Sequence, residues 1–180
     1  MVDPLFVSTV PNACDYINIL NRNLTVYYCV DDFSLWPGLN QDLVRKMENQ
    51  LLEKADILVA TSQKLYQKLK SIGKPTHLLT HGVDVELFSH TPLVEHQCLN
   101  DIPNPRVGYF GLIDERSDQS LIAAIASDMP SFSFVMTGPV ATDITRLKMC
   151  KNVYFTGPVI YSELPALIKG LDILFIPYLV

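Results

Sequence analysis

Short apolar runs alternate along the chain with segments in which apolar residues recur at helical spacing. The runs at 25–30 (TVYYCV) and 56–60 (DILVA) have the composition of buried strands. Between them, residues 41–55 place leucine, valine and methionine on one helical face and charged residues on the other. Because parallel strands need a crossover connection, usually a helix, this alternation predicts a parallel sheet covered by helices.

The alternation continues along the chain and divides into two series. In the first series, a helix over 63–72 and a short strand at 77–79 follow, and residues 5–10 are a candidate fourth strand. For the second series, we expect strands at 106–110, 132–136, 153–155 and 173–176 and helices at 118–127 and 162–170.

Between the two series, residues 89–105 have no apolar period and contain three prolines, which is typical of a linker. We therefore predict an α/β protein made of two Rossmann-like parallel-sheet units, residues 1–88 and residues 106–180. Both units are expected to be incomplete. An open doubly wound sheet usually has five or six strands, and the sequence ends on an apolar run.

Charge and cysteine spacing argue against several classes of function. The formal net charge of −5 does not suit a nucleic-acid-binding surface. The four cysteines have no C-x-x-C spacing, so we expect reduced thiols and no zinc site. No run of 18 apolar residues and no secretory signal pattern is present, so the expected location is the cytoplasm.

Two adjacent carboxylates, Asp31 and Asp32, follow the predicted strand at 25–30, and His81 follows the strand at 77–79. The carboxyl ends of parallel strands are where ligands bind in such sheets. Neighbouring carboxylates can raise each other's pKa, and could then act as a base or accept a hydrogen bond from a hydroxyl group. The alternatives are an Asx turn or a helix cap for the carboxylates, and a turn position for His81.

Glycines follow three strands of the second series, where backbone amides can approach an anionic phosphate closely. These glycines are Gly111, Gly138 and Gly157. Arg116 stands just before a predicted helix, so its guanidinium group could hold a diphosphate without a metal ion. Alternatively, Arg116 is a surface residue that pairs with Asp114 or Asp118.

The order of these segments resembles the middle of a GT-B-fold glycosyltransferase of the group-1 type, which uses nucleotide-sugar donors. The resemblance covers nearly all of the 180 residues, and its more specific parts are "HGVD…F" at 81–88 and "VGYFG…D" at 107–114. It also includes the segments "YYCVDDFSLWPG", "ADILVATSQKL", "FSFVMTGPV", "NVYFTGPVIYSELPALI" and "LDILFIPY". The resemblance implies that residues 1–88 come from the acceptor-side domain and residues 106–180 from the donor-binding domain.

On the donor side, the resemblance implies that Gly111 and the loop up to Arg116 border the donor phosphates. Arg116 would stabilise the charge that develops on the leaving diphosphate. Gly138 and Pro139 would line the donor cleft. The loop from Gly157 to Val159 would lie near the nucleotide base.

On the acceptor side, the same resemblance implies that Asp31 and Asp32 face the acceptor, whose hydroxyl group they would contact or deprotonate. Three further residues would lie near the interdomain cleft, where the first domain closes. These residues are His81, Gly82 and Asp84.

The implied function is transfer of a sugar from a nucleotide-diphosphate sugar to a sugar or lipid-linked acceptor, in cell-surface polysaccharide or glycan synthesis. No metal ion or other cofactor is expected, and the full-length enzyme would work in the cytoplasm or at the membrane surface. Two alternatives remain: a non-catalytic nucleotide-sugar-binding or scaffold module derived from the same fold, and an unrelated nucleotide-binding doubly wound protein. The predicted linker argues against the second alternative.

The end of the sequence leads to two further expectations. A full GT-B enzyme is about twice as long, in keeping with two complete domains, and no E-x7-E pattern follows Pro177. We therefore expect weak or absent transferase activity from the chain alone. The apolar segment from Ile173 to Val180 is expected to form an uncovered edge strand that mediates self-association.

Overall fold

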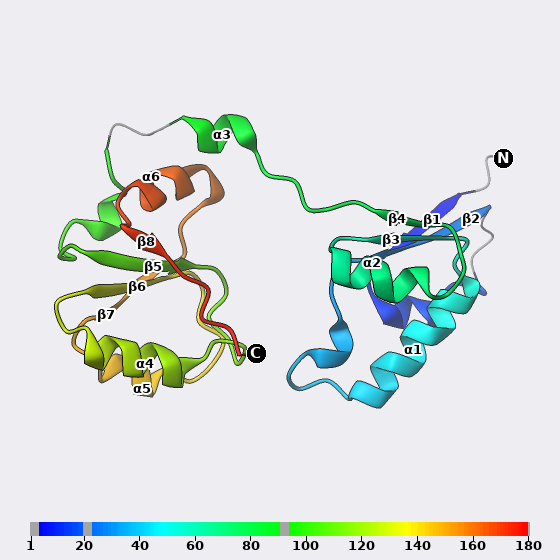
Figure 1. Ribbon diagram of the computed structural model, residues 1–180, viewed down its shortest axis with the longest axis horizontal. Helices are drawn as coiled ribbons and strands as arrows, with labels where there is room; N and C mark the ends of the chain where they lie inside the picture. The colour runs from blue at the N-terminus through cyan, green and yellow to red at the C-terminus, as the bar shows by residue number, and fades with distance from the viewer. Residues whose placement is uncertain (1–3, 20–22, 91–93, 180) are drawn as a thin grey trace. The chain divides into compact units, whose positions relative to one another are not determined.

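The computed structural model describes residues 4–19, 23–90 and 94–179. The chain divides into two units, Met1–Val83 and Asp84–Val180, and each contains its own four-stranded parallel sheet with flanking helices (Figure 1). This confirms the prediction of an α/β fold with two Rossmann-like parallel-sheet units. The division falls a few residues earlier than expected, because helix α3 (Val85–Ser89) belongs to the second unit.

In the first unit, the strands lie side by side in chain order and are all parallel. They are β1 (Leu5–Ser8), β2 (Leu24–Cys29), β3 (Ile57–Ala60) and β4 (Thr76–Leu78). The connecting helices are η1 (Pro11–Asp15), η2 (Phe33–Leu35), α1 (Gln41–Lys54) and α2 (Gln63–Lys70). The candidate strand at 5–10 is therefore present as β1.

The core of the first unit lies on one face of its sheet. Alternate residues of β2 are fully buried, whereas those between them are half-buried, because successive side chains of a strand point to opposite faces. Tyr27 and Cys29 of β2 and Leu58 of β3 pack with Leu51 of α1 and Leu69 of α2. Both helices therefore cover the same face of the sheet.

In the second unit, the strands are parallel in the order β7-β6-β5-β8. They are β5 (Arg106–Phe110), β6 (Ser133–Thr137), β7 (Val153–Gly157) and β8 (Ile173–Leu174). The remaining helices are η3 (Gln97–Leu99), α4 (Gln119–Asp128), α5 (Thr145–Lys148), η4 (Tyr161–Glu163) and α6 (Leu164–Lys169).

Both faces of the second sheet are covered. Phe134 and Met136 of β6 pack in a cluster with residues of α4 and α5, whereas Val135 between them packs with Leu167 of α6. In Figure 1, α4 and α5 accordingly lie on one side of this sheet and α6 lies on the other. Helices on both faces explain why all five residues of β6 are buried.

The second half of the segment expected to be a linker is instead part of the second unit. Leu99 of η3 and Ile102 are buried and pack in the cluster that contains Val135. The linker prediction for 89–105 is therefore wrong over this half. Residues 91–93, which also fall in the predicted linker, lie outside the described residues.

The side chain of Arg106 holds this segment against the sheet. Arg106 is 7% exposed and donates hydrogen bonds to the carbonyl groups of Leu99, Ile102 and Gly170, at 2.7 to 3.0 Å. Its guanidinium group also forms a 2.7 Å ion pair with Glu95. A buried charge with this many partners fixes residues 95–102 to the first strand of the unit.

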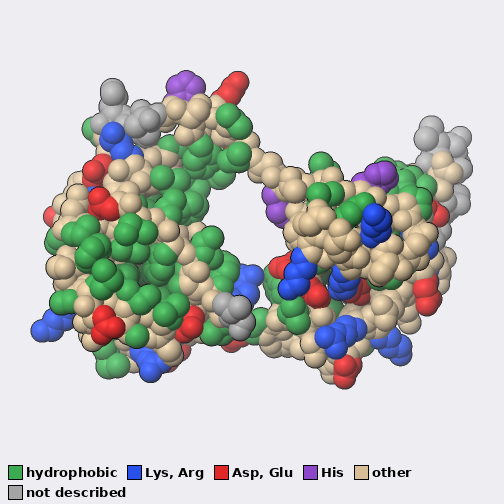
Figure 2. Space-filling view, viewed as in Figure 1, with side chains coloured by type: hydrophobic (Ala, Val, Ile, Leu, Met, Phe, Trp, Pro, Cys, Tyr) green, Lys and Arg blue, Asp and Glu red, His purple; other side chains and the backbone are tan. Residues whose placement is uncertain are grey.

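The last strand of the second unit lies at an edge of its sheet, as predicted. Of the segment expected to form this strand, only Ile173–Leu174 do so. Among the described residues β8 pairs with β5, and Ile173, Leu174, Ile176 and Leu179 are exposed. Figure 2 shows hydrophobic side chains on the surface of this unit. Val180 lies outside the described residues, and self-association through this segment remains a prediction.

Two global features bear on the expectations from composition. All four cysteines are unpaired. Over residues 4–19, 23–90 and 94–179, no helix combines the length and the apolar character that crossing a membrane requires.

Candidate functional site

A pocket of about 450 Å³, which has charged and hydroxyl side chains in its lining and is called the polar pocket below, lies in the first unit at the carboxyl edge of its sheet. Its lining comes from the loops after β2, β3 and β4 and from helix α2. The lining residues are Val30, Asp31, Asp32, Leu35, Thr61, Ser62, Lys64, Leu65, Lys68 and His81. The structure therefore brings Asp31, Asp32 and His81 together in one site.

Both carboxylates of this pocket make local hydrogen bonds. Asp31 accepts one from the Asp32 amide at 2.7 Å and one from the Trp36 indole Nε1 at 2.9 Å. Asp32 caps η2 by accepting hydrogen bonds from the amide and the hydroxyl group of Ser34, at 3.2 and 2.6 Å. These are the turn and cap contacts that the sequence allowed as the alternative to a ligand-binding role.

A partly buried ionic network, which sequence reasoning missed, includes Asp32. Lys68 Nζ lies 3.3 Å from Asp32 Oδ2 and 2.8 Å from Glu48 Oε2. Glu48 is only 5% exposed, and its other oxygen accepts a 3.0 Å hydrogen bond from the Tyr27 hydroxyl group. The one sequence signal for this network is that Glu48 falls on the apolar face of its helix.

The surroundings of Asp32 lower the pKa of its carboxyl group. Burial raises the pKa of the Asp32 carboxyl group, but hydrogen bonds from Ser34 and the charge of Lys68 outweigh it and lower the pKa below its ordinary value. The pKa of Lys68 is raised, because Glu48 and Asp32 together outweigh the effect of burial. A carboxylate with a lowered pKa is a weak base, so the geometry favours hydrogen-bond acceptance by Asp32 over proton removal.

Lys68→Met is expected to raise the pKa of Asp32 towards the ordinary value of about 3.9. The lowered pKa stabilises the fold above the unfolded-state pKa, and this contribution is lost as the pH falls through the folded-state pKa. As the pH falls, protonation of Asp32 should therefore reduce the free energy of unfolding less in the variant than in the wild type. A ¹³C NMR titration of the Asp32 carboxyl carbon measures this pKa separately from that of Glu48, which loses the same partner.

Lys64→Met is the matched control for this prediction. Lys64 lines the same pocket, and among the described residues no ion pair joins it to Asp32. The control should leave the pKa of Asp32 within a few tenths of the wild-type value. An equal shift in both variants would contradict the role of the Lys68 contact.

In the second unit, the three strand-end glycines hold neighbouring loops together. The Gly111 amide donates to the Thr137 carbonyl group and the Gly138 amide to the Gly157 carbonyl group, each at 2.9 Å. Two of the three backbone amides that the sequence suggested for phosphate binding therefore already donate hydrogen bonds to carbonyl groups of the protein. Pro139 is exposed, and its carbonyl group accepts a 2.9 Å hydrogen bond from the Ile113 amide.

The close approach of these loops requires glycine at position 138. Gly138 has a φ of 138°, and a Cβ atom there would lie 1.9 Å from the carbonyl oxygen of Gly111. Gly157 also has a positive φ, 76°, and Val159 two residues later is half-buried. The predicted donor residues of the three loops thus adjoin one another at the carboxyl edge of the sheet.

Arg116 is paired with Asp114, as the alternative interpretation allowed. Its Nη2 lies 2.8 Å from Asp114 Oδ2, and its Nε donates to the same carboxylate. The hydrogen bond from Arg116 lowers the pKa of Asp114. The guanidinium carbon also lies 5.6 Å from the centre of the Tyr178 ring. Asp118 does not take part, since it caps α4 instead.

Two tyrosines that sequence reasoning missed adjoin this pair. The Tyr109 hydroxyl group donates to the Leu112 carbonyl group at 2.9 Å and lies 3.1 Å from the Tyr178 hydroxyl group. Both rings line a small pocket of about 220 Å³ together with residues 174–176. The only sequence signal for them is their position, at the carboxyl end of β5 and just after β8.

The remaining predicted residues lie near the division between the units. A Cβ atom on Gly82 would meet nothing within 4 Å, so no steric reason requires glycine there. Asp84 caps α3 by accepting a 3.0 Å hydrogen bond from the Leu87 amide. The cleft role of His81, Gly82 and Asp84 remains a prediction.

The two parallel-sheet units define the class of fold. Each places loops with polar or glycine residues at the carboxyl edge of its sheet, as nucleotide-binding and sugar-binding Rossmann-like domains do. This arrangement is the one that the GT-B resemblance predicts, and comparisons with known proteins confirm that resemblance.

No family model matches the chain. A curated relative from Bacillus subtilis (strain 168), named as a teichuronic acid biosynthesis glycosyltransferase, TuaH, is 27% identical over 154 residues. The matched region makes up 81% of this chain and 39% of the relative. The chain therefore spans well under half the length of this relative.

Solved structures confirm the fold. The chain matches Alr3699/HepE of Anabaena, crystallised in complex with UDP and glucose, with a TM-score of 0.69, 22% identity and coverage of 94% of this chain and 51% of that chain. It matches sucrose-phosphate synthase of Thermosynechococcus elongatus with a TM-score of 0.73, 15% identity and coverage of 95% and 49%. The chain has the fold of about half of each of these proteins.

Proposed function

We propose that the chain is part of a glycosyltransferase that transfers a sugar from a nucleotide-diphosphate sugar to a hydroxyl group of an acceptor. The observation that carries this proposal is the similarity to TuaH over 81% of the chain. The fold shared with HepE, which was crystallised with UDP and glucose, supports a nucleotide-sugar donor.

The second unit would bind the donor. Three glycine-containing loops adjoin at the carboxyl edge of its sheet, where a nucleotide can lie close to the backbone. Arg116 would stabilise the negative charge on the leaving diphosphate. Because Asp114 already pairs with Arg116, the diphosphate would have to compete with this carboxylate.

The first unit would bind the acceptor in the polar pocket. Asp31 and Asp32 carry the negative charge that suits hydrogen-bond acceptance from sugar hydroxyl groups, and Lys68 pairs with Asp32 at 3.3 Å. In this proposal Asp32 orients the acceptor hydroxyl group and does not remove its proton.

The proposed reaction needs no metal ion, because Arg116 would supply the positive charge at the diphosphate. The proposed location is the cytoplasm or its membrane surface, which suits the four unpaired cysteines.

A non-catalytic sugar-binding module is the second candidate. The observation that favours it is that both carboxylates of the polar pocket are held in turn and cap contacts, and that the pKa of Asp32 is lowered. Such a module would bind the nucleotide sugar without turnover. Once binding is established, release of UDP in a coupled assay would exclude this second candidate.

Arg116→Ala is expected to weaken UDP binding by about 10- to 100-fold, the loss typical of one hydrogen-bonded charge. Isothermal titration calorimetry with UDP, GDP and UDP-glucose measures this change. Arg146→Ala is the control, because Arg146 is an exposed arginine of the same unit that contacts Ser120 on α4. No binding of any nucleotide, or equal affinity in the wild type and Arg116→Ala, would contradict the donor-binding role.

A further inference from the structure

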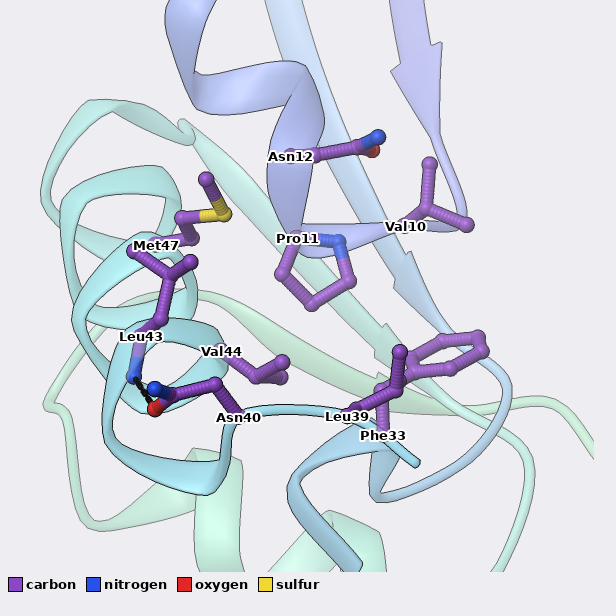
Figure 3. Close-up of a pocket in the computed structure, with 9 residues that line it drawn as sticks. All are labelled: Val10, Pro11, Asn12, Phe33, Leu39, Asn40, Leu43, Val44 and Met47. Carbon is purple, nitrogen blue, oxygen red and sulfur yellow. Dashed lines mark hydrogen bonds between the residues drawn. The ribbon is translucent and has the colours of Figure 1, made fainter. Parts of the chain in front are cut away.

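A second pocket of the first unit, of about 330 Å³, is almost entirely apolar (Figure 3). Helix α1 lines one side of it, and the loops after β1 and β2 line the other. The lining residues are Val10, Pro11, Asn12, Phe33, Leu39, Asn40, Leu43, Val44 and Met47. The carboxamide oxygen of Asn40 is used to cap α1, where it accepts a hydrogen bond from Leu43.

Pro11 and Met47 anchor this pocket to the core, whereas two of its leucines are well exposed. Leu39 is 48% exposed and Leu43 is 50% exposed. Single exposed leucines are ordinary, but these two share one concave site with Val10 and Phe33. A concave apolar site with a few polar groups at its edge is the usual form of a small-molecule pocket.

The apolar and polar pockets share one loop. Asp31, Asp32 and Leu35 line the polar pocket, whereas Phe33 and Leu39, from the same loop, line the apolar one. The rings of Trp36 and Phe33 pack together, with their centroids 5.1 Å apart. The indole Nε1 of Trp36 donates a hydrogen bond to Asp31. This loop therefore contributes carboxylate side chains to the polar pocket and apolar side chains to the apolar pocket.

We infer that the apolar pocket binds the hydrocarbon part of an amphiphilic acceptor whose hydroxylated head lies in the polar pocket. The inference rests on the proposed role of Asp31 and Asp32 in binding the acceptor. A volume of about 330 Å³ lies at the lower end of small-molecule pockets and suits an alkyl segment. A second copy of the chain or a protein partner would need about 800 Å² on each side, far more surface than this pocket offers.

A series of butyl, hexyl and octyl β-D-glucosides, kept below their micelle concentrations, tests the inference with the full chain. Burial of each added methylene group should tighten binding about fourfold, because it is worth about 0.8 kcal/mol. Calorimetry should therefore show about 15-fold tighter binding for octyl than for hexyl glucoside. A dissociation constant that does not change with chain length would overturn the inference.

Leu43→Asn and Leu39→Asn should each weaken binding of octyl glucoside and reduce this dependence on chain length. Both leucines are about half exposed, so the variants should fold, and Leu39→Asn in the loop serves if the helix variant does not. Leu121→Asn, at a 45% exposed leucine of α4, is the control and should bind like the wild type. If Leu43→Asn and Leu39→Asn both bind like the wild type, the assignment of this pocket is wrong.

UDP titration of the same proteins separates this inference from the donor proposal. Leu43→Asn should leave UDP affinity unchanged, because the donor would bind the second unit. Chain-length dependence without UDP binding would contradict the donor proposal while supporting the apolar site. Binding to phosphatidylcholine vesicles without any chain-length dependence for the glucosides would overturn the apolar site in favour of a membrane contact.

Discussion

Arg106→Met will destabilise the second unit by about 3–5 kcal/mol, the usual cost of removing one partner from a buried polar network. Three buried carbonyl groups, those of Leu99, Ile102 and Gly170, lose their donor in this variant. Each unsatisfied group costs about 1–3 kcal/mol. Loss of the ion pair with Glu95 adds less to the destabilisation, because the Glu95 side chain is partly exposed and can be solvated.

Urea denaturation followed by circular dichroism measures the loss, with Arg146→Met as the control. Arg146 is exposed, so its replacement should change the free energy of unfolding by no more than about 0.5 kcal/mol. If Arg106→Met unfolded at the same urea concentration as the wild type, the segment at 95–102 would not be held by this side chain.

Gly138→Ala is expected to destabilise the second unit by about 3 kcal/mol or more and to abolish UDP binding. The new Cβ atom would lie 1.9 Å from the Gly111 carbonyl oxygen, and the φ of 138° is itself unfavourable for alanine. Relief of this clash must separate two of the loops that we propose to bind the donor.

Gly82→Ala is the matched control, since a Cβ atom at Gly82 meets nothing within 4 Å and its φ is not positive. Urea denaturation and UDP titration should give wild-type values for this control. Wild-type stability in Gly138→Ala would show that the loops after β5 and β6 are not packed as described.

The sheet strands could be predicted because each is an apolar or β-branched run between helical segments. The run at 106–110 matches β5 residue for residue, and most other strands differ by one or two residues. Helices α3 and α5 were missed because five or four residues are too few to show a helical period. The second half of the linker was mispredicted because Leu99 and Ile102 are isolated apolar residues, and a buried arginine cannot be told from an exposed one by sequence.

The part of the candidate site formed by residues that follow strands could be predicted from the sequence. Asp31, Asp32 and His81 share a pocket because parallel strands bring their carboxyl ends to one edge. The contacts of Lys68 and Glu48 depend on how two helices pack, which spacing does not specify. The sequence also does not tell whether the Gly111 and Gly138 amides point to a ligand or to the next loop, or that Arg116 pairs with Asp114 and not with Asp118.

We propose that the carboxyl edge of the second sheet binds the diphosphate of a nucleotide sugar. Backbone amide NMR of the full chain during titration with UDP can locate this site, because it reports the position of the ligand residue by residue. We predict shifts concentrated from Gly111 to Arg116, at Gly138 and from Gly157 to Val159. Shifts confined to other residues, or no shifts at saturating UDP, would contradict the claim.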